Sequence, residues 1–365
     1  MTSRSIAFAF SFCASLLWTG VAQAQTPYPV VRGKYYKFEK IADGVYYASP
    51  EFNGTAFPFG SNPFFGANLV VIVNPDDVVL VDSPTTPRAA HAILADIKRL
   101  TSKPVRTVVN THWHYDHTDA NSVFGPEVQI IAHDYVRQAI EKFDILNNEP
   151  FRSSTRNAPQ AMIDRFTRQV AAEKDPSRKA ALEKNLADTK VAAKEFAGDI
   201  KAIKPTPPNV TYSEKLVLHR GGREIQLLFL GRGHTGGDTV VFLPKERIVA
   251  TGDLMESRLA YMGSAFFDEW IATLGALNRL DWAVTLPGHG VPFTSKGLVT
   301  AYQSYLRDVM AQVAKLRAQG VSADDAAKRV DLRSHAKDFP DIEAVGAEVR
   351  GIRRLYAWMD ETGRK

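Results

Sequence analysis

Hydrophobic residues occur along this chain in short runs whose spacing predicts strands alternating with helices. The runs are bounded by Gly, Pro, Asn or Asp, and residues 74–77 and 220–222 predict turns between adjacent strands. The predicted strands are residues 44–50, 68–73, 78–82, 105–110, 215–219, 224–230, 239–243, 248–251 and 283–286. Two strand-rich halves, each interrupted by helices, predict an α/β sandwich of two sheets with helices on both outer faces.

Helical spacing appears first between Thr86 and Leu100, where Ala90, Ile93, Leu94 and Ile97 recur on one face. A second helix is predicted from about Asp268 to Leu280. Both segments lie between predicted strands, so we expect them to cover the sheets.

Two longer segments depart from the alternation of strands and helices. Residues 140–205 predict a helical insertion, with Met162, Phe166 and Val170 on one stripe and a second helix beginning at Asp175-Pro176. The stripe favours a local core or an oligomer interface over a substrate lid. Residues 295–365 predict a helical C-terminal extension, with helices over 298–319 and 343–359.

Composition narrows the class of protein. The 365 residues are 45% hydrophobic and 23% charged, which is typical of a globular chain and excludes wholesale disorder. The net charge of +5 is small and scattered, so nothing indicates nucleic acid as a partner. We expect a small-molecule substrate instead.

The N-terminus predicts export. Arg4, an apolar stretch and Ala22-Gln23-Ala24 fit a signal peptide over residues 1–24, which leaves a domain of residues 25–365 in the periplasm or outside the cell. No later apolar run approaches the ~20 residues that cross a bilayer, so we expect no stable membrane anchor. Cys13 is the only cysteine, so any metal in the mature chain is held by His and carboxylates.

The segment Thr111 to His117 concentrates three histidines and an aspartate directly after a predicted strand: His112, His114, Asp116 and His117. Side chains on a turn at a strand's end can converge on one point. Imidazole and carboxylate groups suit zinc and other first-row divalent ions. A polar loop with incidental histidines is the alternative, and the register of four donors argues against it.

This motif resembles that of the metallo-β-lactamase-fold hydrolases, and three later motifs follow in the order found in that family. They are Gly233-His234-Thr235, Thr251-Gly252-Asp253 and Pro287-Gly288-His289-Gly290, each just beyond a predicted strand. The resemblance covers most of residues 40–295. It implies the αββα sandwich fold and a dinuclear metal site.

The resemblance also implies a role for each donor. One ion is held by His112, His114 and His234, the second by Asp116, His117 and His289, and Asp253 bridges the two. Asp82 matches an early aspartate that supports a ligand through a hydrogen bond. Asp119-Ala120 stands where many relatives have Gly-Gly, which alters the loop backbone but no ligand. The remaining histidines, His91, His133, His219 and His335, are expected to be surface or structural residues.

Two divalent ions about 3.5–4 Å apart can share a hydroxide by lowering the pKa of water towards ~7. We expect that metal-bridging hydroxide to attack a carbonyl or similar electrophile, with Asp116 orienting it and shuttling its proton. Zinc is the expected metal, and these donors also accept Mn or Fe.

The residue at position 253 separates branches of the family. Some zinc β-lactamases have Cys or Ser there, whereas Asp is found in hydroxyacylglutathione hydrolases, acyl-homoserine lactonases and alkylsulfatases. The segment from Leu254 to Trp270 also resembles exported members associated with quinoprotein systems. We therefore expect hydrolysis of a cyclic amide or ester, with a β-lactam or a lactone leading. The alternative is a periplasmic metal-site protein that serves as a binding or redox-system partner without hydrolysis.

An aromatic loop is a further candidate for substrate contact. Residues 52–65 contain five phenylalanines interleaved with Gly and Pro, and the candidate substrate loop is Phe57, Phe59, Phe64 and Phe65. Such a loop either packs beneath the domain or covers the cleft.

Overall fold

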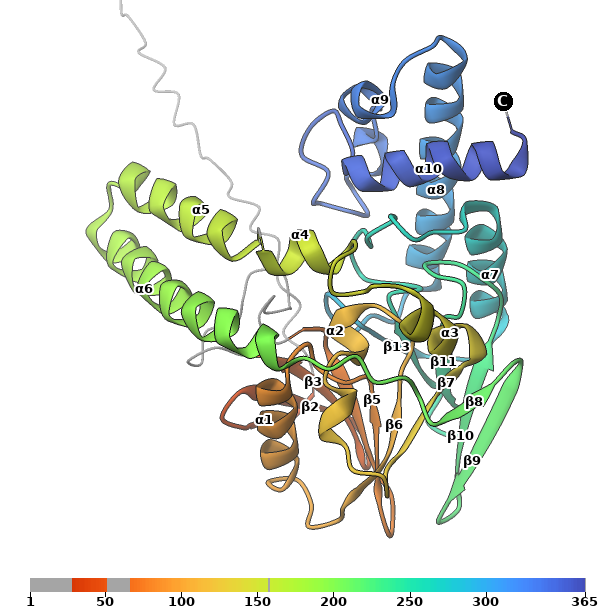
Figure 1. Ribbon diagram of the computed structural model, residues 1–365. Coiled ribbons are helices and arrows are strands. Elements are labelled where there is room, and N and C mark those ends of the chain that lie inside the picture. The colour runs from red at the N-terminus through yellow and green to blue at the C-terminus, as the bar shows by residue number, and fades with distance from the viewer. Residues whose placement is uncertain (1–27, 51–65, 157, 365) are drawn as a thin grey trace, which may run out of the picture.

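The computed structural model describes residues 28–50, 66–156 and 158–364, and its centre is two β-sheets packed face to face (Figure 1). The first sheet has eight strands in the order β1 to β8, antiparallel from β1 to β5 and parallel from β5 to β8. Its strands are β1 (Val30–Arg32), β2 (Tyr36–Ala42), β3 (Val45–Pro50), β4 (Leu69–Val73), β5 (Val78–Val81), β6 (Val105–Val109), β7 (Gln129–His133) and β8 (Val210–Tyr212).

The second sheet has five strands in the order β13-β12-β11-β10-β9. Only β12 and β13 run parallel in it. Its strands are β9 (Lys215–Arg220), β10 (Arg223–Phe229), β11 (Thr239–Leu243), β12 (Ile248–Gly252) and β13 (Val284–Pro287). The predicted strands are confirmed, whereas β1, β2, β7 and β8 were not predicted.

Three apolar layers follow from this arrangement. Between the sheets lies a core that includes Ile72, Val109, Leu227 and Ala250, all nearly inaccessible to solvent. Helix α1 (Pro87–Ile97) covers the outer face of the first sheet, and helix α7 (Phe267–Arg279) covers the outer face of the second. The expected αββα sandwich is therefore confirmed.

The insertion begins after α3 (Asp134–Lys142) with α4 (Phe151–Arg156). It continues as the long hairpin α5 (Ala158–Ala172) and α6 (Pro176–Asp199), which extends away from the sandwich (Figure 1). Asp175 caps α6 by accepting a hydrogen bond from the Arg178 amide, as predicted. The base of the hairpin rests on α1, where Met162 packs with the buried Phe196.

The C-terminal extension stacks on α7 and consists of α8 (Lys296–Ala318), α9 (Ala323–Arg329) and α10 (Val349–Thr362). The predicted start of the last helix at Glu343 was wrong. Glu348 caps α10 through a hydrogen bond from the Gly351 amide, and the preceding residues are not helical. Within the described ranges, none of the helices has both the length and the apolar character needed to span a membrane.

Candidate metal centre

The motif His112 to His117 lies where β6 ends and the short helix α2 (Tyr115–Thr118) begins. Asp82, just beyond the neighbouring strand β5, fixes this turn by accepting hydrogen bonds from the Thr111 amide at 2.7 Å and the Thr111 hydroxyl at 2.9 Å. The Thr111 carbonyl in turn accepts a hydrogen bond from the amide of Thr239 at 2.7 Å, on the second sheet. Both sheets thus hold the start of the motif.

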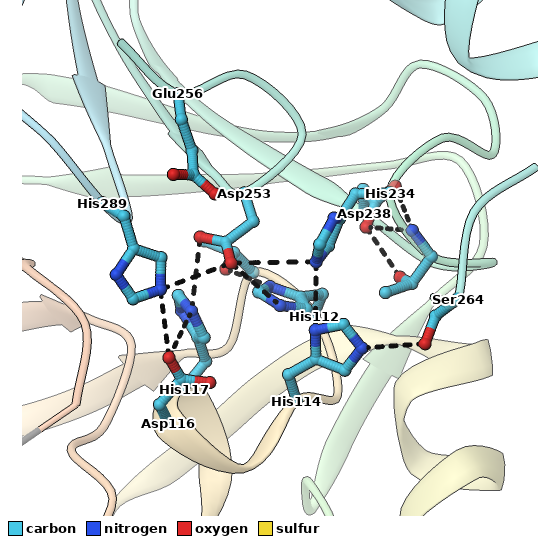
Figure 2. Close-up of polar contacts among 12 residues, drawn as sticks. His112, His114, Asp116, His117, His234, Asp238, Asp253, Glu256, Ser264 and His289 are labelled. Atoms are coloured by element: carbon cyan, nitrogen blue, oxygen red, sulfur yellow. Dashed lines mark hydrogen bonds and ion pairs between the residues drawn. The ribbon is translucent and has the colours of Figure 1, made fainter. Parts of the chain in front are cut away.

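One group of donors consists of three imidazoles and a carboxylate: His112, His114, His234 and Asp253. One ligand atom from each lies within 4.8 Å of the others, and all four side chains are buried. His114 Nδ1 is 3.0 Å from His234 Nε2, and His114 Nε2 is 3.0 Å from Ser264 Oγ (Figure 2).

The second group consists of Asp116, His117 and His289, with ligand atoms again within 4.8 Å of one another. His289 Nε2 lies 3.0 Å from Asp116 Oδ2. His117 turns its other ring nitrogen, Nδ1, to Asp82 Oδ2 at 2.8 Å. The predicted supporting role of Asp82 is therefore matched by a direct hydrogen bond.

Asp253 lies between the two groups (Figure 2). Its Oδ2 is 3.8 Å from His112 Nε2 and 3.7 Å from His234 Nε2. On the other side, Oδ1 is 3.4 Å from His117 Nε2, and Oδ2 is 3.4 Å from His289 Nε2. A single carboxylate therefore faces both groups, which is the geometry expected of a bridging residue.

The imidazoles of the first group are held in the neutral form. Burial is the main cause that lowers the pKa of His112 and His114 well below the usual range, and neighbouring imidazoles add to it. Burial likewise lowers the pKa of His234 to about 4. Neutral imidazoles have a lone pair available, which is the form that binds a metal.

The second group has the opposite electrostatics. Burial lowers the pKa of His289, but Asp253 and Asp116 outweigh it and raise the value to about 10. Nearby carboxylates, Asp253 first among them, also raise the pKa of His117 against the effect of burial. Without an ion, the carboxylates of this group therefore favour protonated imidazoles, and a divalent ion would replace that positive charge.

The donor set fits divalent metal ions. Nε2 of His112, Nε2 of His117 and Oδ1 of Asp253 are buried atoms without a hydrogen-bond partner, although buried polar atoms normally have one. Gly288 keeps the space open, because a Cβ at this position would lie 2.3 Å from Asp253 Oδ1. The His and Asp groups are thus compatible with a dinuclear site.

The His289 loop is anchored from the first sheet. Tyr47, on β3, donates a hydrogen bond to the Pro287 carbonyl at 2.9 Å. The amide of Asn68 donates to the Gly288 carbonyl at 2.7 Å, and its side chain donates to the Gly290 carbonyl at 3.2 Å. The sequence did not reveal these two anchors, because no local pattern links β3 or β4 to a loop that follows β13.

Three further polar side chains near the donors were also not predicted (Figure 2). Asp238 accepts hydrogen bonds from the Thr235 amide and hydroxyl, and burial raises its pKa to about 7. Burial, followed by the charge of Asp253, raises the pKa of Glu256 to about 7. Ser264, the third, contacts His114 as described above.

Three further groups singled out in the sequence are Asp119, His133 and the phenylalanine loop. Asp119 takes a right-handed helical conformation at the end of α2. Its carboxylate is buried without a hydrogen-bond partner. His133 is a structural residue that stacks on Phe229. The candidate substrate loop, Phe57, Phe59, Phe64 and Phe65, lies outside the described residues.

The match to a protein-family model shows to which superfamily the chain belongs. The model of the metallo-beta-lactamase superfamily matches residues 62–129 and 159–294, more than half of the chain. This chain belongs to the metallo-beta-lactamase superfamily. Members of this superfamily are generally hydrolases, and the matched ranges contain all seven donors.

Relatives within the superfamily are distant. A linear primary-alkylsulfatase from Pseudomonas sp. is 23% identical over 301 residues, which are 78% of this chain and 54% of that protein. The 2,4-dinitroanisole O-demethylase subunit alpha from Nocardioides sp. is 24% identical over 216 residues, 58% of this chain and 49% of that protein. The chain spans about half the length of these curated relatives.

Solved structures share the superfamily fold. The metallo-beta-lactamase from Pontibacter korlensis matches with a TM-score of 0.50 at 18% identity, covering 75% of this chain and 99% of that one. The sec-alkylsulfatase Pisa1 from Pseudomonas sp. matches with a TM-score of 0.59 at 14% identity, covering 89% of this chain and 50% of that one. At these identities the likeness concerns the fold alone.

Proposed function

We propose that this protein is an exported, dinuclear metal-dependent hydrolase that acts on a cyclic amide or ester. The observation that carries the proposal is the position of Asp253, whose carboxylate faces both donor groups at 3.4–3.8 Å. His112, His114 and His234 would hold the first ion. Asp116, His117 and His289 would hold the second. Zinc is the metal we propose, because imidazole and carboxylate are its usual ligands in hydrolases.

When bound, two divalent ions supply a water of lowered pKa and polarise the substrate oxygen. The protein's own residues position the reactants. Without an ion, His117 and His289 lower the pKa of Asp116 against the effect of burial. The Asp116 carboxylate is the group that would accept a hydrogen bond from the attacking water. Asp82 fixes the His117 ring through Nδ1 and so keeps Nε2 directed at the site.

Two substrate classes are supported by different observations. An aspartate at position 253 supports hydrolysis of an ester, a thioester or a lactone. The predicted signal peptide supports a substrate met outside the cytoplasm, such as a β-lactam, a lactone or an environmental ester. The alkylsulfatase relative, matched over 78% of this chain, favours a sulfate ester. Both reactions need a polarised oxygen and an activated water, so the same donors serve either class.

A hydrolysis screen tests the proposal. Zinc-loaded protein is assayed against nitrocefin, a carbapenem, homoserine lactones, thioesters, aryl esters and linear alkyl sulfates, with Asp253→Ala as the matched control. We expect turnover of at least one class by the parent and its loss in the variant. A metal-loaded parent that hydrolyses none of them would favour the alternative, a periplasmic binding or redox-system partner.

A further inference from the structure

The loop from Tyr261 to Ala265 connects the metal centre with the C-terminal extension. On its inner side, Ser264 Oγ lies 3.0 Å from His114 Nε2. The Tyr261 ring stands edge-on to the His114 imidazole, with 5.7 Å between ring centroids. The loop therefore contacts His114. This donor histidine turns Nδ1 towards His234 and Nε2 towards the loop.

On its outer side, the loop is packed directly against α10. Gly351 of α10 approaches so closely that a Cβ there would lie 2.9 Å from Met262 Cε and 3.0 Å from Met262 Cβ. Any larger residue at position 351 would displace the loop, because Met262 Cβ is bonded directly to the loop backbone and cannot move without it. The helix itself would tolerate the change, since glycine is a poor helix former.

Two arginines of α10 add polar contacts to the same loop. Arg354 Nε donates a hydrogen bond to the Ala265 carbonyl at 3.0 Å, one residue beyond Ser264. The Arg350 guanidinium lies over the Tyr261 ring, 4.7 Å from its centroid. Arg350 also donates to the Ser153 hydroxyl on α4, so it joins the insertion and the extension at this loop.

We propose that Ser264 is a positioning residue of the metal centre and that α10 holds it in place. If the Nδ1 lone pair of His114 faces the site next to His234, Nε2 carries the ring proton, and this N–H donates a hydrogen bond to Ser264 Oγ. A hydrogen-bond partner of this kind sets both tautomer and ring orientation. The inference rests on the proposed function, because it presupposes an ion at His112, His114 and His234. It assigns part of that site to a helix outside the segments that match the family model.

The first test replaces the hydroxyl. Ser264→Ala removes the partner of Nε2, Ser264→Thr keeps a hydroxyl, and Ser304→Ala makes the same change on the exposed face of α8. Zinc affinity is measured by chelator competition, and the cobalt-substituted protein gives a d–d spectrum that reports the ligand geometry. We expect Ser264→Ala to weaken zinc binding about 10–100-fold and to shift the cobalt spectrum. We expect Ser264→Thr to restore most of both, and Ser304→Ala to match the parent.

The second test moves the loop from outside. Gly351→Leu places a side chain against Met262. Gly275→Leu is the matched control on α7, where a Cβ would meet no atom closer than 3.4 Å. We expect Gly351→Leu to reproduce the altered cobalt spectrum and the weakened zinc binding while the far-ultraviolet circular dichroism stays unchanged, and Gly275→Leu to have neither effect.

The outcomes separate the two proposals. Parent-like zinc affinity and cobalt spectra in both Ser264→Ala and Gly351→Leu would overturn the positioning role while leaving the metal site and the hydrolase proposal intact. A parent protein that takes up no divalent ion would overturn both. Weaker zinc binding in Ser264→Ala that Ser264→Thr does not restore would also overturn the role of the hydroxyl.

Discussion

Asp82 Oδ2 lies 2.8 Å from His117 Nδ1, and this carboxylate belongs to a residue with a left-handed backbone conformation, at φ +66°. A residue other than glycine adopts this conformation at a cost in free energy, least for Asn and Asp. Here the conformation aims one side chain at both Thr111 and His117. Local strain at position 82 is thus coupled to the geometry of the candidate metal centre.

Replacing Asp82 by Asn should loosen the second ion. Asparagine tolerates the left-handed conformation and can still accept from the Thr111 amide, but its NH2 group cannot accept a hydrogen bond from His117 Nδ1. We expect zinc affinity at the His117 group to fall about 10–100-fold, measured by chelator competition. Asp76→Asn, on an exposed turn, is the control. Unchanged affinity in Asp82→Asn would exclude a supporting role for this carboxylate.

Removing the carboxylate between the groups should separate the two ions. In Asp253→Ala the first group keeps three imidazoles, whereas the second loses the oxygen that ties it to its neighbour. We expect about one ion per chain, an unchanged fold, and kcat/KM lowered by several orders of magnitude for every accepted substrate. Asp253→Ser should behave similarly unless the substrate is a β-lactam. Wild-type activity in the alanine variant would mean that Asp253 is not a ligand.

Gly288 should not tolerate a side chain. A methyl group there would lie 2.3 Å from Asp253 Oδ1 and 2.8 Å from His117 Cε1, so Gly288→Ala must displace one or both. We expect loss of the second ion and of activity, read from metal content and kcat/KM. Gly198→Ala on α6 is the control, because a Cβ there meets nothing within 4 Å. If Gly288→Ala keeps two ions and full activity, the described geometry of this loop is wrong.

Metal retention should depend on pH differently at the two groups. The raised pKa of His289, about 10, means that a proton must leave before an ion binds there, so affinity at this group falls as pH falls below that value. The pKa of His234, about 4, leaves the first group free of that competition until the solution is acidic. Dialysis from about pH 8 to about pH 5, followed by elemental analysis, should show one ion lost before the other. Simultaneous loss would contradict this order.

The sequence predicted those parts of the site that depend on local pattern. His112, His234, Asp253 and His289 each follow an apolar strand, and strands that end at one edge of a sandwich bring such residues together. Ser264 was not predicted, because its role depends on how α10 packs against the loop that carries it. The same holds for Tyr47, whose partner carbonyl lies 240 residues away along the chain.

The strands and the helix boundary that were not predicted lie where the pattern of hydrophobic and polar residues is weak. β2 carries the polar residue Glu39 at a buried position, and β8 has only three residues. β7 was missed although its residues Ile130 to His133 are buried, because no alternation marks it. The start of α10 depends on the capping of Gly351 by Glu348. Before it, Gly346 has φ +122°, and the amides of Gly346 and Ala347 donate hydrogen bonds to the carbonyls of Val330 and Ala327, so these residues are not helical.

The number of divalent ions bound per chain tests the dinuclear assignment most directly. Seven donors, including one carboxylate that faces both groups, are more than a single four-coordinate zinc uses. Elemental analysis of the purified protein after equilibration with excess zinc and gel filtration should therefore give close to two ions per chain. A stoichiometry that stays at one under excess zinc would contradict the dinuclear site.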